Sequence, residues 1–299
     1  MRERAQIQLL PDGHRLYLHD GPIDLIVEGF GASHEIQAAY RAAAQRFVTV
    51  LDELCGELAI LRQPLRTEGA GLSSAVARRM AAAVAPYTAR TFITPMAAVA
   101  GAVAEEILAA MTAAATLERA YVNDGGDIAL HLETGQHFVV GMIDRPDRPS
   151  LFGSAVLHAS QPARGIATSG WRGRSFSLGI ADAVTVLADR ASAADAAATI
   201  IANAVDLPAH PNVLRVQARE LASDNDLGER LVTQGVGKLS AEEINIALAA
   251  GEAVARALLS EGLIGAAALH LRGETRTVTS ALQVHMLGSQ VQNRSLVHA

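Results

Sequence analysis

The spacing of apolar residues divides the chain into short alternating segments and longer segments of helical period. Near the N-terminus, apolar runs at residues 6–10, 15–18 and 23–27 are separated by Pro11-Asp12-Gly13 and Gly21-Pro22, which are strong turn signals. We therefore expect an antiparallel meander at the start of the chain.

Four segments have the apolar spacing or the capping residues of helices. Residues 34–58 predict a long amphipathic helix, and a second helix is expected to begin at Ser73 or Ser74. A third is expected from about Thr94, because Pro95 suits a first helical turn. Ser240 and Glu243 have the spacing of a capping box and predict a further helix.

After Glu118 the apolar period changes to two, which is typical of strands. The expected strands lie at residues 119–122, 128–132, 137–140, 154–158 and 183–187, with a final hairpin at 264–271 and 275–278. These patterns predict an α+β fold with a largely antiparallel sheet packed with helices. No linker or repeat interrupts residues 1–280, so we expect a single domain there and a mobile C-terminal tail over 281–299.

Composition narrows the class of protein. Half of the 299 residues are hydrophobic and 19% are charged, as in a globular protein, and the net charge of −6 argues against a nucleic-acid partner. The charged N-terminus does not resemble a signal peptide, and Glu105 and Glu106 interrupt the apolar run at 96–110. We expect a cytoplasmic protein without a membrane partner. Cys55, the only cysteine, is expected to be a buried thiol.

The stretch from Gly165 to Val205 carries much of the candidate chemistry, in the order of a small-residue turn, a basic loop, a strand and an Ala-rich helix. Ser192 and Asp195 have the spacing of a capping-box-like helix start. Alternatively, Asp195 and Thr199 lie four residues apart on one helix face, where a carboxylate and a hydroxyl can bind one hard cation. The two interpretations are compatible, because the helix dipole favours a carboxylate in the first turn.

Two further segments each allow a structural and a functional interpretation. Asn123-Asp124-Gly125-Gly126-Asp127 predicts a tight turn, but its glycines would also let backbone amides approach a phosphate while its two acids face a cation or ribose hydroxyls. The small residues between Ala97 and Ala104 predict close helix packing, or else the close approach of a flat ligand.

The sequences NDGGDIAL, GIATSG and VTVLADRASAADAAAT occur in the order found in the ApbE-like superfamily, the FAD:protein FMN transferases. Over residues 94–205 the chain resembles this superfamily, and most closely a cytosolic branch of it. The resemblance implies a T-fold-like domain that binds FAD and Mg²⁺. It also implies transfer of FMN to a hydroxyl of an acceptor protein.

The resemblance also implies roles for particular residues. Asp195 and Thr199 match the family's metal ligands, whose third member is a main-chain carbonyl that would fall near Ala97. The residues that would bind the flavin nucleotide are those of the NxGGD turn and of the TSG segment, namely Asn123, Gly125, Gly126, Asp127, Thr168, Ser169 and Gly170.

The chain departs from the transferases at two positions of that pattern. Where they have DxGxxAKG, this chain has Thr94 in place of the acid and Ala100 in place of the lysine. It also lacks the family's histidine before Ile180. Neutralising a pyrophosphate would then fall to the metal, Arg172 and Arg174, unless these arginines are solvated.

Two classes of function follow. One is a Mg²⁺-dependent flavin-nucleotide enzyme, either a transferase or an FAD pyrophosphatase. The other is a non-catalytic nucleotide-binding or accessory protein for a metabolic partner, for example in sulfur amino-acid metabolism. Whether the protein is an enzyme stays open at this point. Because a single chain leaves sheet edges unpaired, we also expect a homodimer.

Overall fold

The computed structural model describes residues 5–65, 71–143, 151–279 and 296–298. Its residues form two compact units whose segments alternate along the chain. The first unit draws on residues 1–138, 157–166 and 189–195, and the second on 139–156, 167–188 and 196–299. The single domain expected over residues 1–280 stays a prediction.

The N-terminal meander is confirmed in the first unit. Strands β1 (Gln6–Leu9), β2 (Leu16–Asp20) and β3 (Ile23–Phe30) pair antiparallel, and β4 (Arg119–Asp124) and β5 (Asp127–Leu132) follow in the same sense. The order of the nine-stranded sheet is β1-β2-β3-β4-β5-β8-β9-β12-β13. A large, largely antiparallel sheet is therefore present, as predicted.

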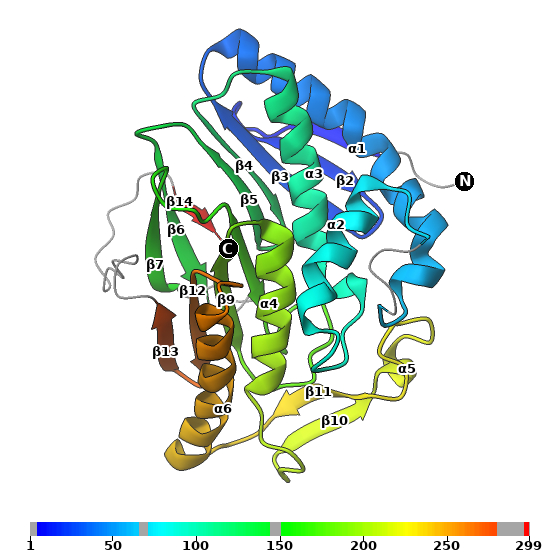
Figure 1. The fold of residues 1–299 in the computed structure, drawn as a ribbon, viewed down its shortest axis with the longest axis vertical. Helices are drawn as coiled ribbons and strands as arrows, with labels where there is room; N and C mark the ends of the chain where they lie inside the picture. The colour runs from blue at the N-terminus through cyan, green and yellow to red at the C-terminus, as the bar shows by residue number, and fades with distance from the viewer. Residues whose placement is uncertain (1–4, 66–70, 144–150, 280–295, 299) are drawn as a thin grey trace. The chain divides into compact units, whose positions relative to one another are not determined.

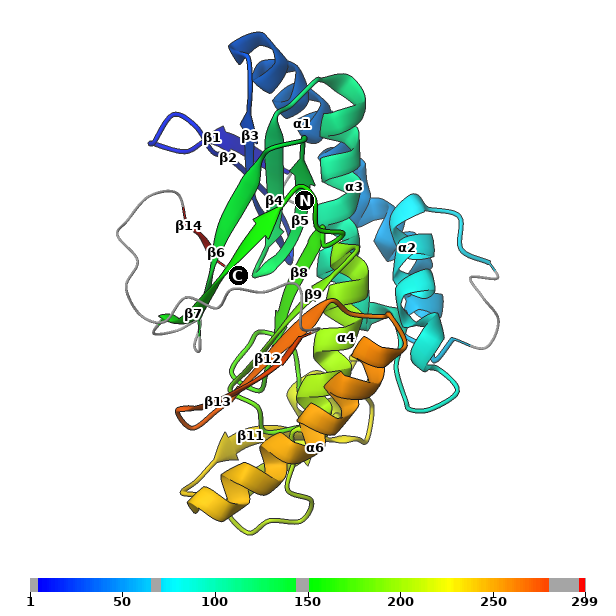
Figure 2. The ribbon, with the colours of Figure 1, turned by 60° about the vertical axis from the view of Figure 1, so that its left-hand side comes forward.

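The helices of the first unit lie on one face of its strands (Figures 1 and 2). They are α1 (Ser33–Leu61), α2 (Ala75–Val84) and α3 (Val99–Ala114), with short 3-10 turns at Ala85–Tyr87 and Pro95–Ala98. Alternation along β3 directs Leu25 and Val27 toward this helical layer, where they join Phe47, Ile107 and Met111 in a fully buried core.

The segment Pro95–Ala114 is long and apolar enough, by length and composition, to cross a membrane, and it is the one such stretch among the described residues. Core helices of globular proteins pass the same test. Seven residues of α3 are buried in the first unit, among them Ile107, Leu108 and Met111. This burial agrees with the prediction of a core helix.

The second unit contains β9 (Ala183–Ala188), β12 (Ala266–Leu271) and β13 (Glu274–Thr279), which pair antiparallel in that order. Helix α6 (Ala241–Ser260) packs on β12 and β13 (Figure 2) and begins with the predicted capping box. Strands β10 (Val213–Gln217) and β11 (Leu231–Val236) form a separate ribbon beside the short helix α5 (Ala218–Leu221).

The remaining strands correct one expectation. The small-residue turn predicted at Ala167-Thr168-Ser169-Gly170 is instead part of a strand as far as Ser169. This strand is β8 (Gly165–Ser169). A small sheet is formed by β6 (His137–Ile143), β7 (Leu151–His158) and β14 (Leu296–His298). Of the predicted mobile tail, only β14 is described, and it is a strand; residues 281–295 and 299 lie outside the described part of the chain.

Cys55 is exposed on α1, so the prediction of a buried thiol is wrong. Its neighbours Leu51 and Leu54 are on the buried side of this helix. The apolar stripe passes through Leu51, Leu54 and Leu61, and Cys55 falls outside it.

Glu57 stabilises the start of α2 from the neighbouring helix α1. Its carboxylate accepts hydrogen bonds from the backbone N–H and hydroxyl groups of Ser73 and Ser74, and Ser74 is the N-cap. Partial burial alone would raise the pKa of Glu57, but these hydrogen bonds outweigh it and lower the pKa to about 2.

We expect Glu57→Gln to cost about 1 kcal/mol at neutral pH, the value of a surface helix cap, because solvent screens part of the interaction. Since the folded pKa is the lower one, the contribution of Glu57 is complete above its ordinary pKa of 4.5 and is lost as the pH falls toward 2. Urea unfolding at pH 7 and pH 3 measures the free energy of unfolding of wild type and Glu57→Gln. The difference between the two proteins should be smaller at pH 3 than at pH 7. An equal difference at both pH values would contradict the stabilising role of the Glu57 carboxylate.

Candidate functional site

The NDGGD segment is a two-residue hairpin turn between β4 and β5. Asp124 and Asp127 are opposite each other in the strand register, and Gly125 and Gly126 have φ angles of 64° and 115°, which side chains rarely allow. The Asn123 side-chain oxygen accepts a 2.8 Å hydrogen bond from the Gly126 N–H. The predicted tight turn is confirmed, while its contact with a phosphate stays a prediction.

Asp124 is a buried acid that the sequence analysis did not single out among the candidate site residues. It is opposite Leu25 in the register with β3, which directs its side chain toward the helical layer, and it is only 4% exposed. The sequence does contain a signal for Asp124, because this acid occupies the variable position x of the family pattern NxGGD. The acids of this turn were considered for a cation or for ribose hydroxyls, but of the two only Asp127 was chosen as a candidate site residue.

Asp195 projects from helix α4 (Ala191–Ala204) to the start of α3. Its Oδ2 atom accepts a hydrogen bond of 3.0 Å from the Gly101 N–H, in the first turn of α3. Although part of the residue reaches solvent, burial of the carboxylate raises its pKa to about 7. The N–H groups of Gly101 and Ala100 favour the charged form, and the negative charge of Asp124 disfavours it.

The start of α4 corrects the capping-box interpretation of Ser192. The first helical hydrogen bond runs from the Ala194 N–H to the Arg190 carbonyl, so the helix starts before Ser192. The N–H and hydroxyl of Ser192 instead donate to Oε1 of Glu105, at 2.6 and 2.7 Å. A carboxylate from α3 therefore binds the first turn of α4, and Asp195 has a different partner.

The two helices approach closely at Gly101. A Cβ atom there would lie 2.4 Å from the Ala191 carbonyl oxygen and 2.7 Å from the Ser192 nitrogen, closer than real Cβ atoms come. At this position the packing interpretation of the small-residue segment is confirmed. Sequence reasoning did not identify Gly101 or Glu105 as partners of α4.

The other two predicted metal ligands are placed as follows. Ala97 lies in the 3-10 turn Pro95–Ala98 directly before α3, and its N–H donates to the Thr94 carbonyl at 3.1 Å. Thr199 follows Asp195 by about one turn of α4 and belongs to the second unit. Their metal-binding roles stay predictions.

In the second unit, the TSG segment ends β8. The Thr168 hydroxyl is 2.9 Å from that of Thr185 on the neighbouring strand β9. Gly170 follows Ser169, and a Cβ atom at Gly170 would lie 2.5 Å from the Asp182 carbonyl oxygen. Close backbone approach explains the glycine, and a nucleotide contact of Thr168, Ser169 and Gly170 stays a prediction.

Asp182 organises the basic loop that follows this segment. Its Oδ1 accepts hydrogen bonds from Nε of Arg172 at 2.8 Å and from the Trp171 indole at 3.1 Å, and its Oδ2 accepts from the Arg272 N–H at 2.7 Å. The Arg172 guanidinium also lies 4.3 Å from the Trp171 ring centroid. Because Asp182 balances the charge of Arg172, this arginine is a weak candidate for neutralising a pyrophosphate. Arg174 is exposed.

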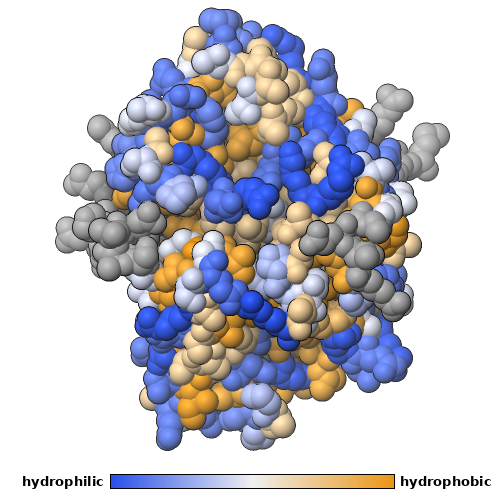
Figure 3. Space-filling model, in the orientation of Figure 1, coloured by the Kyte–Doolittle hydropathy of each residue, from blue (hydrophilic) through white to orange (hydrophobic). Residues whose placement is uncertain are grey.

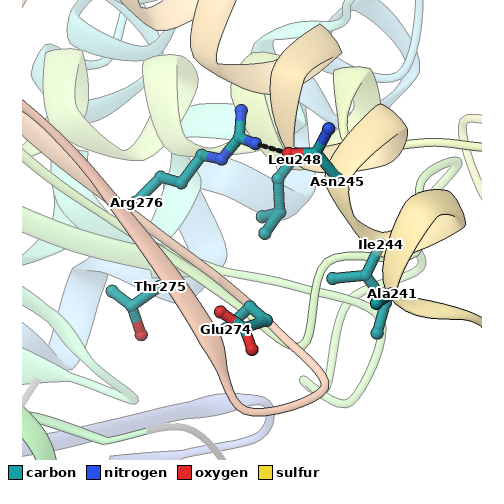
Figure 4. Close-up of a pocket in the computed structure, with 7 residues that line it drawn as sticks. All are labelled: Ala241, Ile244, Asn245, Leu248, Glu274, Thr275 and Arg276. Carbon is teal, nitrogen blue, oxygen red and sulfur yellow. Dashed lines mark hydrogen bonds between the residues drawn. The ribbon is translucent and has the colours of Figure 1, made fainter.

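A pocket of about 400 Å³ lies between the start of α6 and the edge strand β13 in the second unit (Figure 4). It is lined by Ala241, Ile244, Asn245, Leu248, Glu274, Thr275 and Arg276. None of these is a predicted site residue. Arg276 already binds Glu252 at 2.8 Å and the side chain of Asn245, so its charge is balanced. On the face of the molecule drawn in Figure 3, hydrophilic and hydrophobic residues are interspersed.

The described acidic side chains near the start of α3 include two carboxylates, those of Asp124 and Asp195. Within the described part of the chain, no group of three or more His, Cys, Asp or Glu residues could hold a metal ion. Asp195 and Asp124 are two carboxylates, and Mg²⁺ is typically held by one or two carboxylates together with phosphate oxygens and waters. The site therefore fits Mg²⁺ that arrives with a nucleotide better than a metal held by protein alone.

The chain belongs to the family described as AbpE bacteria, whose model matches residues 7–277, and through it to the ApbE-like superfamily. The superfamily membership and the mixed α and β fold expected from the sequence are thereby confirmed.

Relatives of this chain include archaeal proteins named UPF0280. One from Methanopyrus kandleri is 40% identical over 142 residues, which are 47% of this chain and 52% of that protein. Another, from Methanosphaerula palustris, is 34% identical over 186 residues, or 57% of this chain and 71% of that protein. The match spans only about half the length of the M. kandleri protein and of a relative from Methanocella arvoryzae.

One solved structure is also similar, the apo form of the flavinyl transferase ApbE from Pseudomonas stutzeri. It covers 93% of this chain and 96% of its own, with 11% identity and a TM-score of 0.42.

Proposed function

We propose that this protein binds a flavin or adenine nucleotide together with Mg²⁺, with Asp195 as the carboxylate that holds the metal. The observation that carries the proposal is a buried Asp195 carboxylate close to the charge of Asp124; burial first, and the negative charge of Asp124 second, raise the pKa of Asp195 to about 7. Holding two carboxylates together away from water is unfavourable, and a bound cation turns their repulsion into attraction. The NDGGD turn supports the proposal, because it offers backbone amides beside these acids.

The resemblance of the sequence to the superfamily favours FAD as the nucleotide. Ala97 and Thr199 would complete the metal site, and Thr168, Ser169 and Gly170 would contact the nucleotide. As a transferase, the protein would transfer FMN from FAD to a hydroxyl oxygen of an acceptor protein, so that the pyrophosphate bond breaks, AMP leaves and the hydroxyl gives up its proton. As a pyrophosphatase, it would convert FAD and water into FMN and AMP. We place this activity in the cytoplasm.

Binding without transfer is the second candidate. It is favoured by Thr94 and Ala100, which stand where the transferases have an acid and a lysine, and by the missing histidine. Arg172 does not compensate for these changes, because it is paired with Asp182. In this case the protein would serve a metabolic partner as a nucleotide-binding accessory.

We expect calorimetry with FAD, FMN, ATP and ADP to give Mg²⁺-dependent binding of at least one of them. A matched titration without Mg²⁺ should give much weaker binding, because the metal bridges phosphate and carboxylate oxygens. No heat and no thermal shift with any of the four would contradict the proposal. Incubation with FAD and Mg²⁺ then tests the pyrophosphatase, since this activity releases FMN and AMP; incubation with an added acceptor protein tests the transferase, since transfer releases AMP and leaves FMN covalently attached to the acceptor. Intact FAD in both incubations indicates binding without catalysis.

We also propose a homodimer that forms through β1. This strand is at the end of the sheet order and carries no charge or proline, and its Ile7 and Leu9 are 44% and 54% exposed. Antiparallel pairing of two copies about Gln8 would place each Ile7 opposite a Leu9. Light scattering at micromolar concentration should give a dimer, and Ile7→Lys a monomer. A monomeric wild type would contradict this assignment.

A further inference from the structure

Helices α3 and α4 bind each other's first turns through a reciprocal pair of carboxylates. Asp195 of α4 accepts the Gly101 N–H at 3.0 Å in the first turn of α3. In return, Glu105 of α3 accepts both the N–H and the hydroxyl of Ser192 in the first turn of α4. All four residues belong to the first unit.

We propose that Glu105 is a positioning residue that fixes the Asp195 carboxylate through the first turn of α4. Asp195 follows Ser192 by three residues, so holding the Ser192 backbone sets the rotation and height of the turn that carries Asp195. The side chain of Glu105 is 15% exposed and Ser192 is 3% exposed. Both hydrogen bonds are therefore largely shielded from competing water.

Helix α2 holds Glu105 in turn. Nε of Arg79 lies 3.6 Å from Oε2 of Glu105, so one carboxylate oxygen faces Arg79 while the other binds Ser192. Arg79 also binds Glu106 at 3.2 Å, and Glu106 binds Arg46 at 2.7 Å. This ion-pair network restricts the rotamer of Glu105 before any ligand is present.

The neighbouring acid provides a matched control. Glu106 has the same side chain, lies next to Glu105 on α3 and shares Arg79. Its recorded partners are Arg46 and Arg79, on α1 and α2, rather than the first turn of α4. A general loss of helix packing should affect both positions, whereas positioning of Asp195 should depend on Glu105 alone.

The test measures hydrogen exchange of the Gly101 amide by NMR in the ligand-free protein, because this amide donates to Asp195. We expect Glu105→Ala to accelerate exchange about tenfold relative to the Ile107 amide in the same helix. Glu106→Ala should leave this ratio within about threefold of wild type. Glu105→Gln should restore most of the protection, because its amide oxygen can still accept from Ser192. If Glu105→Ala does not fold, Ser192→Ala replaces it in the test. This variant loses only the hydroxyl hydrogen bond to Glu105, so exchange of the Gly101 amide relative to the Ile107 amide should accelerate by less than about tenfold.

Equal effects of Glu105→Ala and Glu106→Ala on the Gly101 ratio, or failure of Glu105→Gln to restore protection, would overturn the inference. The consequence for ligands rests on the proposed function: Mg²⁺-dependent nucleotide affinity should fall about tenfold in Glu105→Ala and stay unchanged in Glu106→Ala. A wild type that binds no nucleotide would refute the proposed function, yet the exchange measurement would still decide the role of Glu105.

Discussion

Gly101→Ala is expected to be among the most destabilising single substitutions in this protein. Its Cβ atom would lie 2.4 Å from the Ala191 carbonyl oxygen, 2.5 Å from the Ala191 carbonyl carbon and 2.7 Å from the Ser192 nitrogen. All three are backbone atoms, so relief requires α3 and α4 to separate rather than one side chain to rotate. We expect a loss of about 3 kcal/mol in the free energy of unfolding, at the upper end for overpacking.

Gly56→Ala is the control for this substitution. Gly56 also lies inside a helix, α1, but a Cβ atom there would have no neighbour within 4 Å. Alanine should therefore stabilise the protein by about 0.5–1 kcal/mol through its higher helix propensity. Chemical denaturation measures the free energy of unfolding of both variants relative to wild type. A Gly101→Ala protein as stable as wild type would mean that the helices do not pack as described.

Local signals in the sequence predicted those elements that local interactions determine. The Ser240 capping box, the glycine pair of the β4–β5 turn and the alternation along β3 each involve residues within a few positions of one another. Such patterns identify the ends and faces of elements before tertiary packing is known. The family motifs added Asp195, which composition and spacing alone left open between a cap and a ligand.

The residues that sequence reasoning missed are those defined by contacts between distant segments. Glu105 and Ser192 are 87 positions apart, and Gly101 and Asp195 are 94 apart. A carboxylate supplied from α3 replaced the local cap expected at Ser192. Likewise, Asp124 on strand β4 is notable because of its neighbour Asp195 on helix α4. No periodic pattern encodes such pairs, because each residue also has a satisfactory local explanation.

Asp195→Asn separates the structural role of this carboxylate from its proposed role as a metal ligand. The asparagine oxygen can still accept the Gly101 hydrogen bond, so the packing of α3 on α4 should persist. Burial and the charge of Asp124 already disfavour ionised Asp195 and raise its pKa to about 7. Removing the charge should therefore leave the metal-free protein as stable as wild type, or more stable by up to about 1 kcal/mol at pH 8.

The effect on ligand binding should be far larger. Asn keeps one neutral oxygen but loses the charge that attracts Mg²⁺, so Mg²⁺-dependent nucleotide affinity should fall about 100-fold, or about 2.7 kcal/mol. Thr199→Val should weaken binding less, because it removes a neutral ligand. Asp189→Asn is the matched control, since Asp189 precedes α4 and its side chain is 63% exposed. Calorimetric titration of the nucleotide into wild type and each variant, with and without Mg²⁺, measures these affinities. If Asp195→Asn and wild type show the same Mg²⁺ dependence, Asp195 stabilises the start of α3 and holds no metal.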